Sequence, residues 1–238
     1  MKEKMLTVAI IAGGLATRLH PITENIPKSL VEVAGKPFIQ WQLENLKDQG
    51  INNVMVCVGH LGKMIIEFIS SKNNFGLNIN FSEDGPNLLG TGGSIKNASD
   101  YLGKDFFLLY GDSYLPVNFS DIQNSYFRQR KPGLMTILKN NNKWDKSNVI
   151  YEKGEILEYN KKVAKKKMQY IDFGLCILSK KTLKNYPSNS KFDIADVYES
   201  LSKKQQLGSY LVHTRFYEIG SLKGLKETES YFLSKEIL

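Results

Sequence analysis

Short apolar segments alternate with amphipathic segments through the first half of the chain. Continuous apolar runs are typical of strands covered on both faces, and they occur at 6–11, 54–58 and 106–110. The segment 77–81 alternates between apolar and polar residues, as a further strand does. Helical spacing of apolar residues predicts helices at 38–46, 64–69 and 94–101. This order predicts an α/β fold of Rossmann-like type, with a mainly parallel mixed sheet and helices on both faces.

The pattern changes after about residue 131, where shorter strand candidates follow one another. They lie at 133–139, 148–151, 156–159 and 170–178, and helical stretches follow at about 193–204 and 221–236. We expect a single domain over 1–238, in which a core of about 1–130 carries a smaller lobe of about 131–238 on the same sheet. We also expect Trp144 in surface packing and His213 in a strand.

The length and composition fit a folded chain with a sizeable core. The chain has 238 residues, 42% of them hydrophobic, and no apolar run approaches the roughly 20 residues that span a bilayer. Residues 1–5 lead straight into the first strand without the apolar region of a signal peptide, so we expect a cytoplasmic protein with no membrane partner. Cys57 and Cys176 lie within apolar runs and are predicted to be buried thiols.

The chain is basic, with a formal net charge of +8. One stretch contributes Lys161, Lys162, Lys165, Lys166 and Lys167. Such a stretch is one way to bind nucleic acid, but no aromatic residues are interleaved with these lysines and no nucleic-acid motif is present. We therefore favour a solvated loop with one or two lysines facing a small anionic molecule, and we do not expect nucleic acid as a partner.

The glycine-rich segment after the first strand is the main candidate for chemistry. Gly13 and Gly14 lack side chains, so backbone N–H groups there can close on phosphate oxygens. Arg18 offers a planar fork for phosphoryl oxygens, and Lys28 offers a mobile positive charge. This combination predicts a triphosphate site. Its spacing matches neither G-x-x-x-x-G-K-[ST] nor G-x-G-x-x-G.

A carboxylate follows the predicted strand at 106–110. Asp112 stands between Gly111 and Ser113, and the carboxyl ends of parallel strands share one rim of an open sheet. Asp112 is therefore expected beside the glycine-rich segment. Since Mg²⁺ binds one or two carboxylates together with phosphate oxygens and water, Asp112 is a candidate Mg²⁺ ligand. A turn-capping role for Asp112 is the alternative.

Residues 13–28 resemble the opening motif of the sugar-phosphate nucleotidylyltransferases, G-G-x-x-T-R-L-x-P-x-T-x-x-x-P-K, with every fixed position filled. Four later segments resemble further motifs of this family in the same order, at 89–93, 110–113, 171–174 and 217–221. The resemblance covers essentially the whole chain. It implies the nucleotide-diphospho-sugar transferase fold, with a nucleotide-binding core and a lobe that binds the acceptor.

The resemblance also implies a reaction, in which a sugar 1-phosphate oxygen attacks the α-phosphorus of a nucleoside triphosphate and pyrophosphate leaves. Arg18 and Lys28 are then the candidate catalytic residues, and Asp112 and Glu218 the candidate ligands of a Mg²⁺ cofactor. The candidate nucleotide-binding residues are Ala12, Gly13, Gly14, Thr17, Arg18, Leu89, Gly90, Thr91 and Asp112. The candidate sugar-phosphate-binding residues are Gly111, Lys161, Lys162, Asp172 and Gly174.

Three positions depart from the family pattern. Glu218 stands where the family has Asp, and its extra methylene would shift a bound metal unless the backbone compensates. Asp172 stands where the family has Asn. The usual Glu-Lys pair is replaced by Glu-Tyr-Asn-Lys-Lys at 158–162, so either Lys161 or Lys162 is the candidate phosphate-binding lysine, with Lys161 favoured.

Within the family, the segments 88–93, 110–116 and 170–175 most resemble the heptose 1-phosphate guanylyltransferase branch. That branch implies GTP and D-glycero-α-D-manno-heptose 1-phosphate as substrates, and GDP-heptose for lipopolysaccharide or capsule as product. The alternative enzyme is a cytidylyl-, uridylyl- or thymidylyltransferase acting on a hexose 1-phosphate or a phosphocholine-like acceptor. The alternative of another class is a non-catalytic nucleotide-sugar binding protein. A homodimer is left open.

Overall fold

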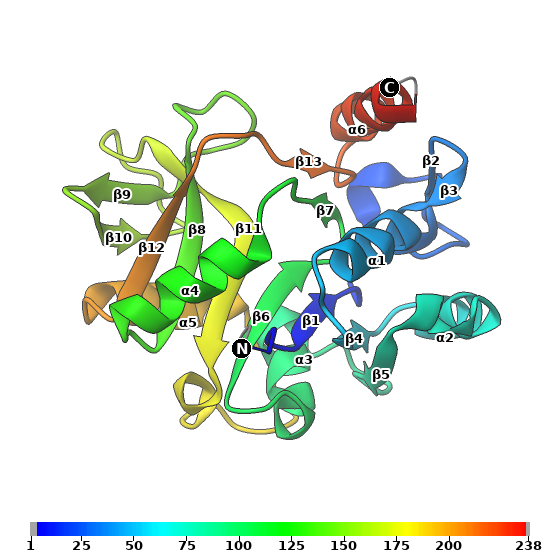
Figure 1. Ribbon diagram of the computed structural model, residues 1–238, viewed down its shortest axis with the longest axis horizontal. Coiled ribbons are helices and arrows are strands. Elements are labelled where there is room, and N and C mark those ends of the chain that lie inside the picture. Colours follow the sequence, from blue (N-terminus) through cyan, green and yellow to red (C-terminus); the bar gives the residue numbers. More distant parts are fainter. Residues whose placement is uncertain (1–3, 237–238) are drawn as a thin grey trace.

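A computed structural model describes residues 4–236, so residues 1–3 of the N-terminal segment and residues 237–238 lie outside the description. Within these residues, one sheet of nine strands runs through the molecule (Figure 1). Seven strands lie in the order β10-β9-β11-β6-β1-β4-β5, and β8 pairs with both β11 and β12. The strands of this sheet are β1 Val8–Ile11, β4 Asn53–Val58, β5 Asn78–Glu83, β6 Asp105–Tyr110, β8 Gly133–Lys139, β9 Val149–Glu152, β10 Glu155–Tyr159, β11 Tyr170–Ser179 and β12 Leu207–Val212.

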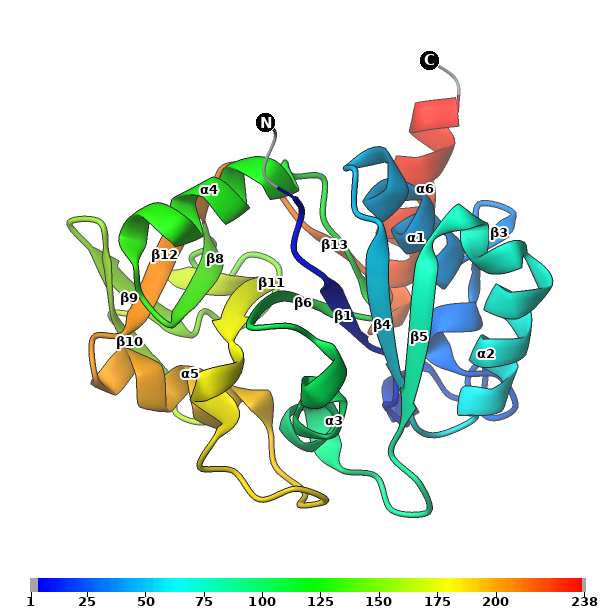
Figure 2. The ribbon, with the colours of Figure 1, turned by 60° about the horizontal axis from the view of Figure 1, so that its bottom comes forward.

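The amino-terminal half of the sheet is parallel. β6, β1, β4 and β5 pair in parallel, with Ile10 of β1 opposite both Val56 and Leu109. Ile10 packs into one buried cluster and its neighbour Ala9 into the other, because successive side chains of a strand point to opposite faces. The predicted α/β fold with helices on both faces is confirmed. One face is covered by α1 (Phe38–Asp48), α2 (Gly62–Ser71) and α4 (Phe119–Gln129), the other by α3 (Gly90–Ala98) and α5 (Ile194–Lys203) (Figure 2).

The carboxyl-terminal half of the sheet is mostly antiparallel. β11 pairs antiparallel with β6 on one side and with β8 on the other, and β9 and β10 form a hairpin. Only β12 returns parallel to its neighbour β8 within this half of the described chain. The ten-residue β11 thus belongs to both halves, and its residues Cys176 and Ile177 enter the same two clusters as β1. The chain therefore forms a single domain around one mixed sheet.

Most predicted elements lie within a few residues of those observed. The helix predicted at 94–101 differs most, because it begins at Gly90 and its last residues form a separate 3-10 turn, Ser99–Tyr101. α4 was not predicted, and β12 was anticipated only through the expectation that His213 lies in a strand. α4 starts at its N-cap Asn118, whose side chain accepts the Asp121 N–H over 3.1 Å. His213 lies just beyond β12 and is exposed, so its predicted place in a strand is wrong.

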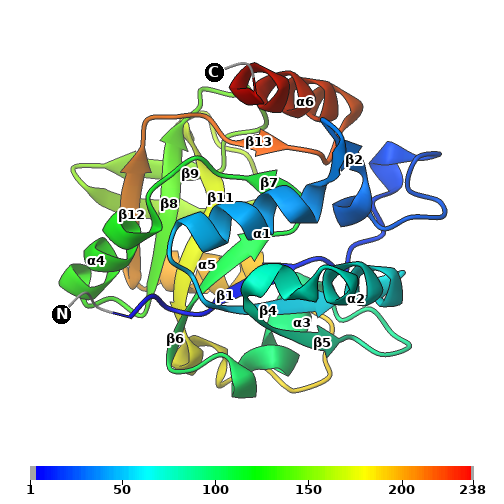
Figure 3. The same cartoon turned by 45° about the vertical axis from the view of Figure 1, so that its right-hand side comes forward.

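A short ladder brings a late part of the chain to the carboxyl end of β6. β7 (Ser113–Tyr114) pairs antiparallel with β13 (Tyr217–Glu218), which places Glu218 opposite Ser113. The helix α6 (Leu222–Glu236) packs beside this ladder (Figure 3), and its Phe232 stacks on Trp41 of α1 with ring centroids 4.1 Å apart. A second small ladder joins β2 (Glu32–Val33) to β3 (Lys36–Pro37), which immediately precede α1 in the chain. Glu218 and Asp112 are thereby brought to the same end of β6.

Two further expectations concern the buried thiols and the bilayer. Cys57 and Cys176 are both free and buried, as predicted, and burial raises the pKa of Cys57 to about 12. None of the helices described between residues 4 and 236 combines the length and the apolar character that a bilayer span requires.

Candidate active site

The two cations predicted for phosphate binding converge on one carboxylate at the carboxyl ends of β1 and β6. The Lys28 ammonium lies 2.6 Å from Oδ2 of Asp112. Asp112 follows β6, whose last residue Tyr110 pairs with Ile11 at the end of β1. Since β1 and β6 are parallel neighbours, the loop after β1 and the carboxylate after β6 share one rim of the sheet, as predicted.

The glycine-rich loop folds against the end of β4. A Cβ on Gly13 would lie 3.0 Å from the amide nitrogen of Gly59, so this close approach favours glycine. Further along the loop, the Thr23 hydroxyl donates to the Ala16 carbonyl over 2.9 Å. This bond holds the turn that carries Arg18, which is exposed yet reaches the cavity beside Asp112.

Positive charge keeps the Asp112 carboxylate ionised. Burial by itself raises the pKa of Asp112, but the Lys28 ammonium, the Ser113 hydroxyl and the Arg18 guanidinium outweigh burial and lower the pKa below its ordinary value. Asp112 is therefore charged at neutral pH and available to a cation.

A buried amide from α1 fixes the backbone on both sides of Asp112. Nε2 of Gln42 donates to the carbonyl oxygens of Tyr110 and Ser113 over 2.9 and 2.8 Å. Gln42 was not among the predicted site residues. Its signal in the sequence is a polar residue on the apolar face of the helix predicted at 38–46, and such a residue needs a buried partner.

Glu218, the second predicted metal ligand, faces the same space as Asp112. A Cβ on Gly220 would lie 2.8 Å from Oε2 of Glu218, 3.2 Å from Nη2 of Arg18 and 3.3 Å from Oδ2 of Asp112. The Glu218 carboxylate accepts the Gly220 N–H and also, over 2.8 Å, the Ser221 hydroxyl. Two carboxylates around a glycine suit one Mg²⁺ that completes its shell with phosphate oxygens and water. Residues 4–236 contain no cluster of three or more His, Cys, Asp or Glu suited to a metal, so the protein offers two donors here.

A small hollow of about 140 Å³ lies on the side of the glycine-rich loop. It is lined by the nucleotide-binding candidates Ala12, Gly14, Thr91 and Asp112, together with Lys28 and Gly111. Gly111 was predicted on the sugar-phosphate side. The structure places it in the lining of this hollow, where its N–H donates to the Ile11 carbonyl over 2.9 Å and continues the pairing of β6 with β1.

The remaining nucleotide-binding candidates do not line this hollow. The Leu89 side chain is buried, and the Thr17 side chain is exposed. Gly13 and Gly90 instead provide close backbone approaches, since a Cβ on Gly90 would lie 2.7 Å from the Phe192 carbonyl oxygen.

A larger cavity of about 560 Å³ adjoins Asp112 on the side of the lobe. Arg18 and Glu218 line it, and so do the sugar-phosphate candidates Lys161, Lys162, Asp172 and Gly174. Asp112 and Tyr110 line both the small hollow and this cavity, so the two spaces adjoin each other at the carboxyl end of β6.

Aromatic side chains that were not predicted form part of the wall of this larger cavity. Phe216 packs edge-on against Trp144 and against Phe173, with ring centroids 6.4 and 5.9 Å apart. Trp144 therefore lines the cavity instead of serving only in surface packing. The backbone N–H of Trp144 donates over 3.2 Å to Oδ1 of Asn140 within an irregular turn, and such a turn has no periodicity from which this position could be predicted.

Asp172 is held in the cavity wall by backbone hydrogen bonds. Its N–H donates to Oδ1 of Asn148 and its carboxylate accepts the Gly174 N–H, each over 2.9 Å. Burial raises the pKa of Asp172 to about 6, although the Gly174 N–H and the Lys161 ammonium oppose the rise. The departure from the family's Asn thus places a group that titrates near pH 6 in the wall of the cavity.

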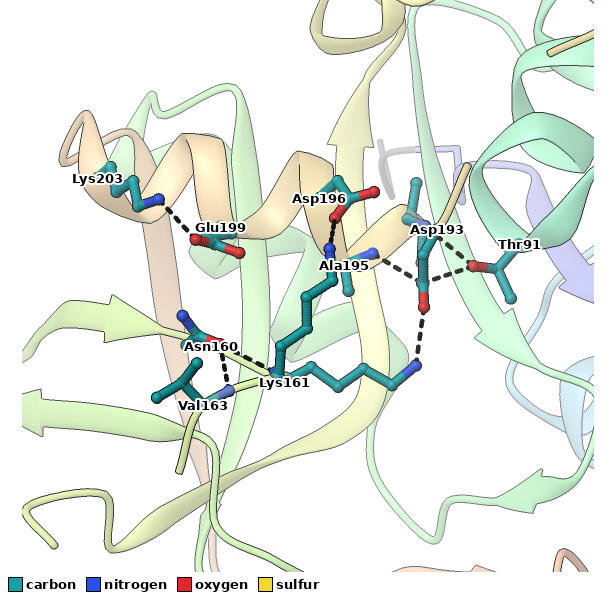
Figure 4. Close-up of polar contacts among 11 residues, drawn as sticks. Thr91, Asn160, Lys161, Val163, Asp193, Ala195, Asp196, Glu199 and Lys203 are labelled. Atoms are coloured by element: carbon teal, nitrogen blue, oxygen red, sulfur yellow. Dashed lines mark hydrogen bonds and ion pairs between the residues drawn. The ribbon is translucent and has the colours of Figure 1, made fainter. Parts of the chain in front are cut away.

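A carboxylate that was not predicted joins the two sides of the site. Asp193, the N-cap residue of α5, accepts the Thr91 hydroxyl over 2.8 Å, the Ala195 N–H over 3.0 Å and the Lys161 ammonium over 3.1 Å (Figure 4). Thr91 lines the small hollow beside the glycine-rich loop, and Lys161 lines the larger cavity. An Asp at the start of a predicted helix is the usual N-cap, so the sequence offered no sign of this second role.

The lysine-rich stretch is exposed, as predicted, and its first members lie against α5. Lys162 donates to Asp196 over 2.8 Å, while Lys165 forms an ion pair of 2.7 Å with Glu158. Lys161 thus shares its partner Asp193 with Thr91, whereas Lys162 contacts a carboxylate further along the helix.

Known proteins of similar sequence define the family. The Nucleotidyl transferase family model matches residues 7–235, so the chain belongs to the nucleotidyl transferase family, as predicted. It is 30% identical over 215 residues to a D-glycero-alpha-D-manno-heptose 1-phosphate guanylyltransferase of Campylobacter jejuni, covering 89% of this chain and 93% of that protein. It is 28% identical over 233 residues to a mannose-1-phosphate guanyltransferase of Gibberella zeae, covering 94% of this chain and 64% of that longer protein.

A solved structure shares the same fold. HddC from Yersinia pseudotuberculosis, crystallised in complex with GMP-PN, superposes with a TM-score of 0.80 at 26% sequence identity. The match covers 96% of this chain and 100% of that chain. The fold is therefore common to nearly the whole of this chain, lobe included.

Proposed function

We propose that this chain transfers a nucleotidyl group from a nucleoside triphosphate to a sugar 1-phosphate and releases pyrophosphate. The observation that carries this proposal is the position of Asp112, which lines both the hollow beside the glycine-rich loop and the cavity of the lobe. Two anionic substrates bound in these spaces would meet at the Lys28–Asp112 pair, where positive charge is available to both.

The triphosphate would bind on the side of the glycine-rich loop. The backbone around Gly14 would approach the phosphates, and Arg18 would bind the β- and γ-phosphates through its planar guanidinium. Lys28 would leave Asp112 and bridge the α-phosphate and the incoming phosphate. Asp112 and Glu218 would hold Mg²⁺, which supplies charge neutralisation on the triphosphate when it is bound.

The sugar 1-phosphate would bind in the larger cavity. Lys161 would contact its phosphate, while Asp172 and Gly174 would contact the sugar. A phosphate oxygen attacks the α-phosphorus, the bond from that phosphorus to the bridging oxygen breaks, and the electron pair leaves with pyrophosphate. The attacking phosphate is already largely ionised near neutral pH, so the residues act by orientation and charge and no general base is needed.

For the particular substrates, we propose GTP and D-glycero-α-D-manno-heptose 1-phosphate, with GDP-heptose for surface glycans as the product. Support comes from the name of the Campylobacter jejuni relative, which matches most of both chains, and from the guanine nucleotide analogue in the HddC crystal. The Gibberella zeae relative favours the same base with mannose 1-phosphate, which is the second candidate acceptor.

A non-catalytic nucleotide-sugar binding protein is the alternative from another class. Such a protein does not need charged side chains placed where a phosphate would react. The Lys28–Asp112 pair and the approach of Glu218 and Arg18 around Gly220 favour chemistry over binding alone.

The test is pyrophosphate release in the presence of Mg²⁺. GTP, CTP, UTP, dTTP and ATP are each combined with heptose 1-phosphate, mannose 1-phosphate, glucose 1-phosphate and phosphocholine. We expect the highest kcat/KM for GTP with the heptose. Release with another pair would keep the reaction and replace the proposed substrates. Nucleotide binding without release from any pair would overturn the proposed reaction.

A further inference from the structure

A second cavity lies at the end of the sheet's strands that is opposite to Asp112. Its volume is about 640 Å³, and it is bounded by the ends of α4 and α5 and by the 3-10 helix Lys180–Leu183. Leu178, near the end of β11, pairs with Gly133 at the start of β8 beside this cavity. Since β11 runs antiparallel to β6, the cavity lies at the amino end of β6, whereas Asp112 follows the carboxyl end of β6. Among residues 4–236, none lines both this cavity and the hollows around Asp112.

We call this cavity the basic pocket, because four cationic side chains line it: Arg130, Lys131, Lys181 and Lys204. Among the side chains of the described residues, none of these four has an ion-pair partner. Their immediate neighbours differ, since Lys180 pairs with Asp100 and Lys203 pairs with Glu199, each over 2.6 Å. Positive charge that converges on a hollow without a carboxylate partner leaves the hollow ready for an anion.

Helix dipoles explain only part of this charge. Arg130 and Lys204 are the C-cap residues of α4 and α5, where a cation also offsets the partial negative charge of the helix end. Lys181 lies in the 3-10 helix Lys180–Leu183, whose four residues are too few to build a substantial helix dipole. A smaller hollow of about 220 Å³ shares Arg130, Lys131 and Lys181 with the basic pocket. Lys104 lines this hollow, and so does Asp105, whose carboxylate accepts the Tyr126 hydroxyl over 2.7 Å.

The other lining groups fit a ligand larger than an inorganic ion. Val197 and Leu201 of α5 form a buried apolar part of the wall, and the side-chain amides of Asn185 and Gln206 offer hydrogen bonds. Tyr186 adds an aromatic ring. Cations for a phosphate, amides for hydroxyl groups and an apolar wall for a ring together match an organic phosphate.

Tyr186 also connects the basic pocket to the nucleotide side of the active site. Its ring stacks on Phe192 with centroids 4.5 Å apart and planes 19° apart. The Phe192 carbonyl accepts the Gly92 N–H over 3.0 Å, and its N–H donates to the Leu89 carbonyl over 3.1 Å. A Cβ on Gly92 would overlap the Phe192 ring, so the segment that carries Thr91 rests directly on this aromatic residue.

We propose that the basic pocket is a second ligand site, specific for an organic phosphate, and that its occupancy alters nucleotide affinity through Tyr186 and Phe192. The binding half of this proposal is independent of the proposed function. The coupling half rests only on nucleotide binding at the Lys28–Asp112 site, and neither half requires turnover.

The binding half is tested by titration calorimetry on three proteins. These are the wild-type chain, the pocket variant Lys181→Gln/Lys204→Gln, and the control Lys184→Gln/Lys191→Gln, which removes the same charge from exposed lysines outside the pocket. The probes are GDP, mannose 1-phosphate, glucose 6-phosphate and pyrophosphate, so that nucleotide and sugar phosphates are distinguished. We expect at least one organic probe to bind wild type and control about tenfold or more tightly than the pocket variant, since charge-assisted hydrogen bonds are lost.

Two results would overturn the binding half. One is that every organic probe binds the three proteins equally, which would place all binding at the active site. The other is that only pyrophosphate discriminates, which would make the pocket an unspecific anion site. The midpoint temperature of thermal unfolding is measured for the three proteins, and equal midpoints exclude misfolding as the cause of a difference in binding.

The coupling half is tested by the Kd of GTP with and without the discriminating probe. A probe that competes with GTP at the active site weakens GTP binding equally in wild type and in the pocket variant. A probe acting from the basic pocket changes the GTP Kd in wild type and in the control only, by about threefold or more on the scale of allosteric coupling. Identical changes in all three proteins, or no change in any, would overturn the coupling.

Discussion

The Lys28 ammonium and the Asp112 carboxylate lie 2.6 Å apart although their residues are 84 positions apart in the chain. Their side chains are only 20% and 26% exposed. Lys28 comes from the loop after β1 and Asp112 from the end of β6, so the parallel pairing of these two central strands creates the pair. A cation proposed for the phosphates thus rests on a carboxylate proposed for the metal, and the Lys28 ammonium helps to hold the pKa of Asp112 below its ordinary value in spite of burial.

Replacing Lys28 by alanine is expected to lower kcat by about 10²- to 10³-fold, because one preorganised donor to the reacting phosphates is lost. The variant should fold, since Arg18 still faces the Asp112 carboxylate. The matched control is Lys36→Ala, which removes a lysine from the partly exposed ion pair with Glu44. Steady-state pyrophosphate release is measured for both. A Lys28→Ala enzyme with wild-type turnover would remove Lys28 from the reaction.

The change Glu218→Gln is expected to raise the Mg²⁺ concentration for half-maximal activity by on the order of tenfold, because one of two carboxylate donors loses its charge. Asp112→Asn should act in the same direction. The change Glu229→Gln alters the net charge equally on the exposed side of α6 and should leave the Mg²⁺ dependence unchanged. A Glu218→Gln variant with the Mg²⁺ profile of the control would show that Glu218 holds no metal.

Replacing Asp172 by asparagine is expected to stabilise the protein above pH 6. The pKa of Asp172 is raised from 3.8 to about 6 in the folded chain, so between these pH values the folded state binds more protons than the unfolded state. The free energy of unfolding therefore falls as the pH rises through this range. Asparagine keeps an acceptor for the Gly174 N–H without the buried charge.

The gain at pH 7.5 is expected to be at most about 3 kcal/mol in the free energy of unfolding, and smaller because the side chain is partly exposed. The difference from wild type should shrink towards zero near pH 4. Urea unfolding at both pH values measures it, with the exposed Asp145→Asn as control. A gain of equal size at the two pH values would contradict the assignment to Asp172 ionisation.

The two neighbouring lysines are expected to differ when each is replaced by alanine. Lys161→Ala should raise the KM for the sugar 1-phosphate by about tenfold or more, because a charge-assisted contact to its phosphate is lost. Lys162 is 69% exposed and pairs with Asp196, so Lys162→Ala should change this KM much less. Lys165→Ala, which removes the partner of Glu158, is the control. Equal KM values for the first two variants would refute the preference for Lys161.

The parts of the fold and site that could be predicted are those that local patterns encode. Val8–Ile11 and Asp105–Tyr110 read as buried strands from their apolar runs alone, and the rule that parallel strands share a rim places Asp112 beside the glycine-rich loop. Glu218 was predicted only through the family resemblance, because its approach to Asp112 depends on the two-residue ladder with Ser113.

The parts that could not be predicted depend on contacts between distant segments. Asp193 reads as an ordinary helix cap, and its bonds to Thr91 and Lys161 exist only once α5 lies against α3. Trp144 reads as a surface residue because its turn has no periodicity. Gly111, predicted to contact the sugar phosphate, lines the hollow beside the glycine-rich loop, where its N–H is bonded to the Ile11 carbonyl.

The most direct test of nucleotidyl transfer incubates the wild-type chain with GTP and Mg²⁺, with and without D-glycero-α-D-manno-heptose 1-phosphate. Pyrophosphate and the mass of the nucleotide product are measured together. Equal amounts of pyrophosphate and GDP-heptose, formed only when the acceptor is present, are predicted. Hydrolysis of GTP without the acceptor, or bound GTP that yields no GDP-sugar with the heptose or with any other sugar 1-phosphate, would contradict a transferase acting at Lys28 and Asp112.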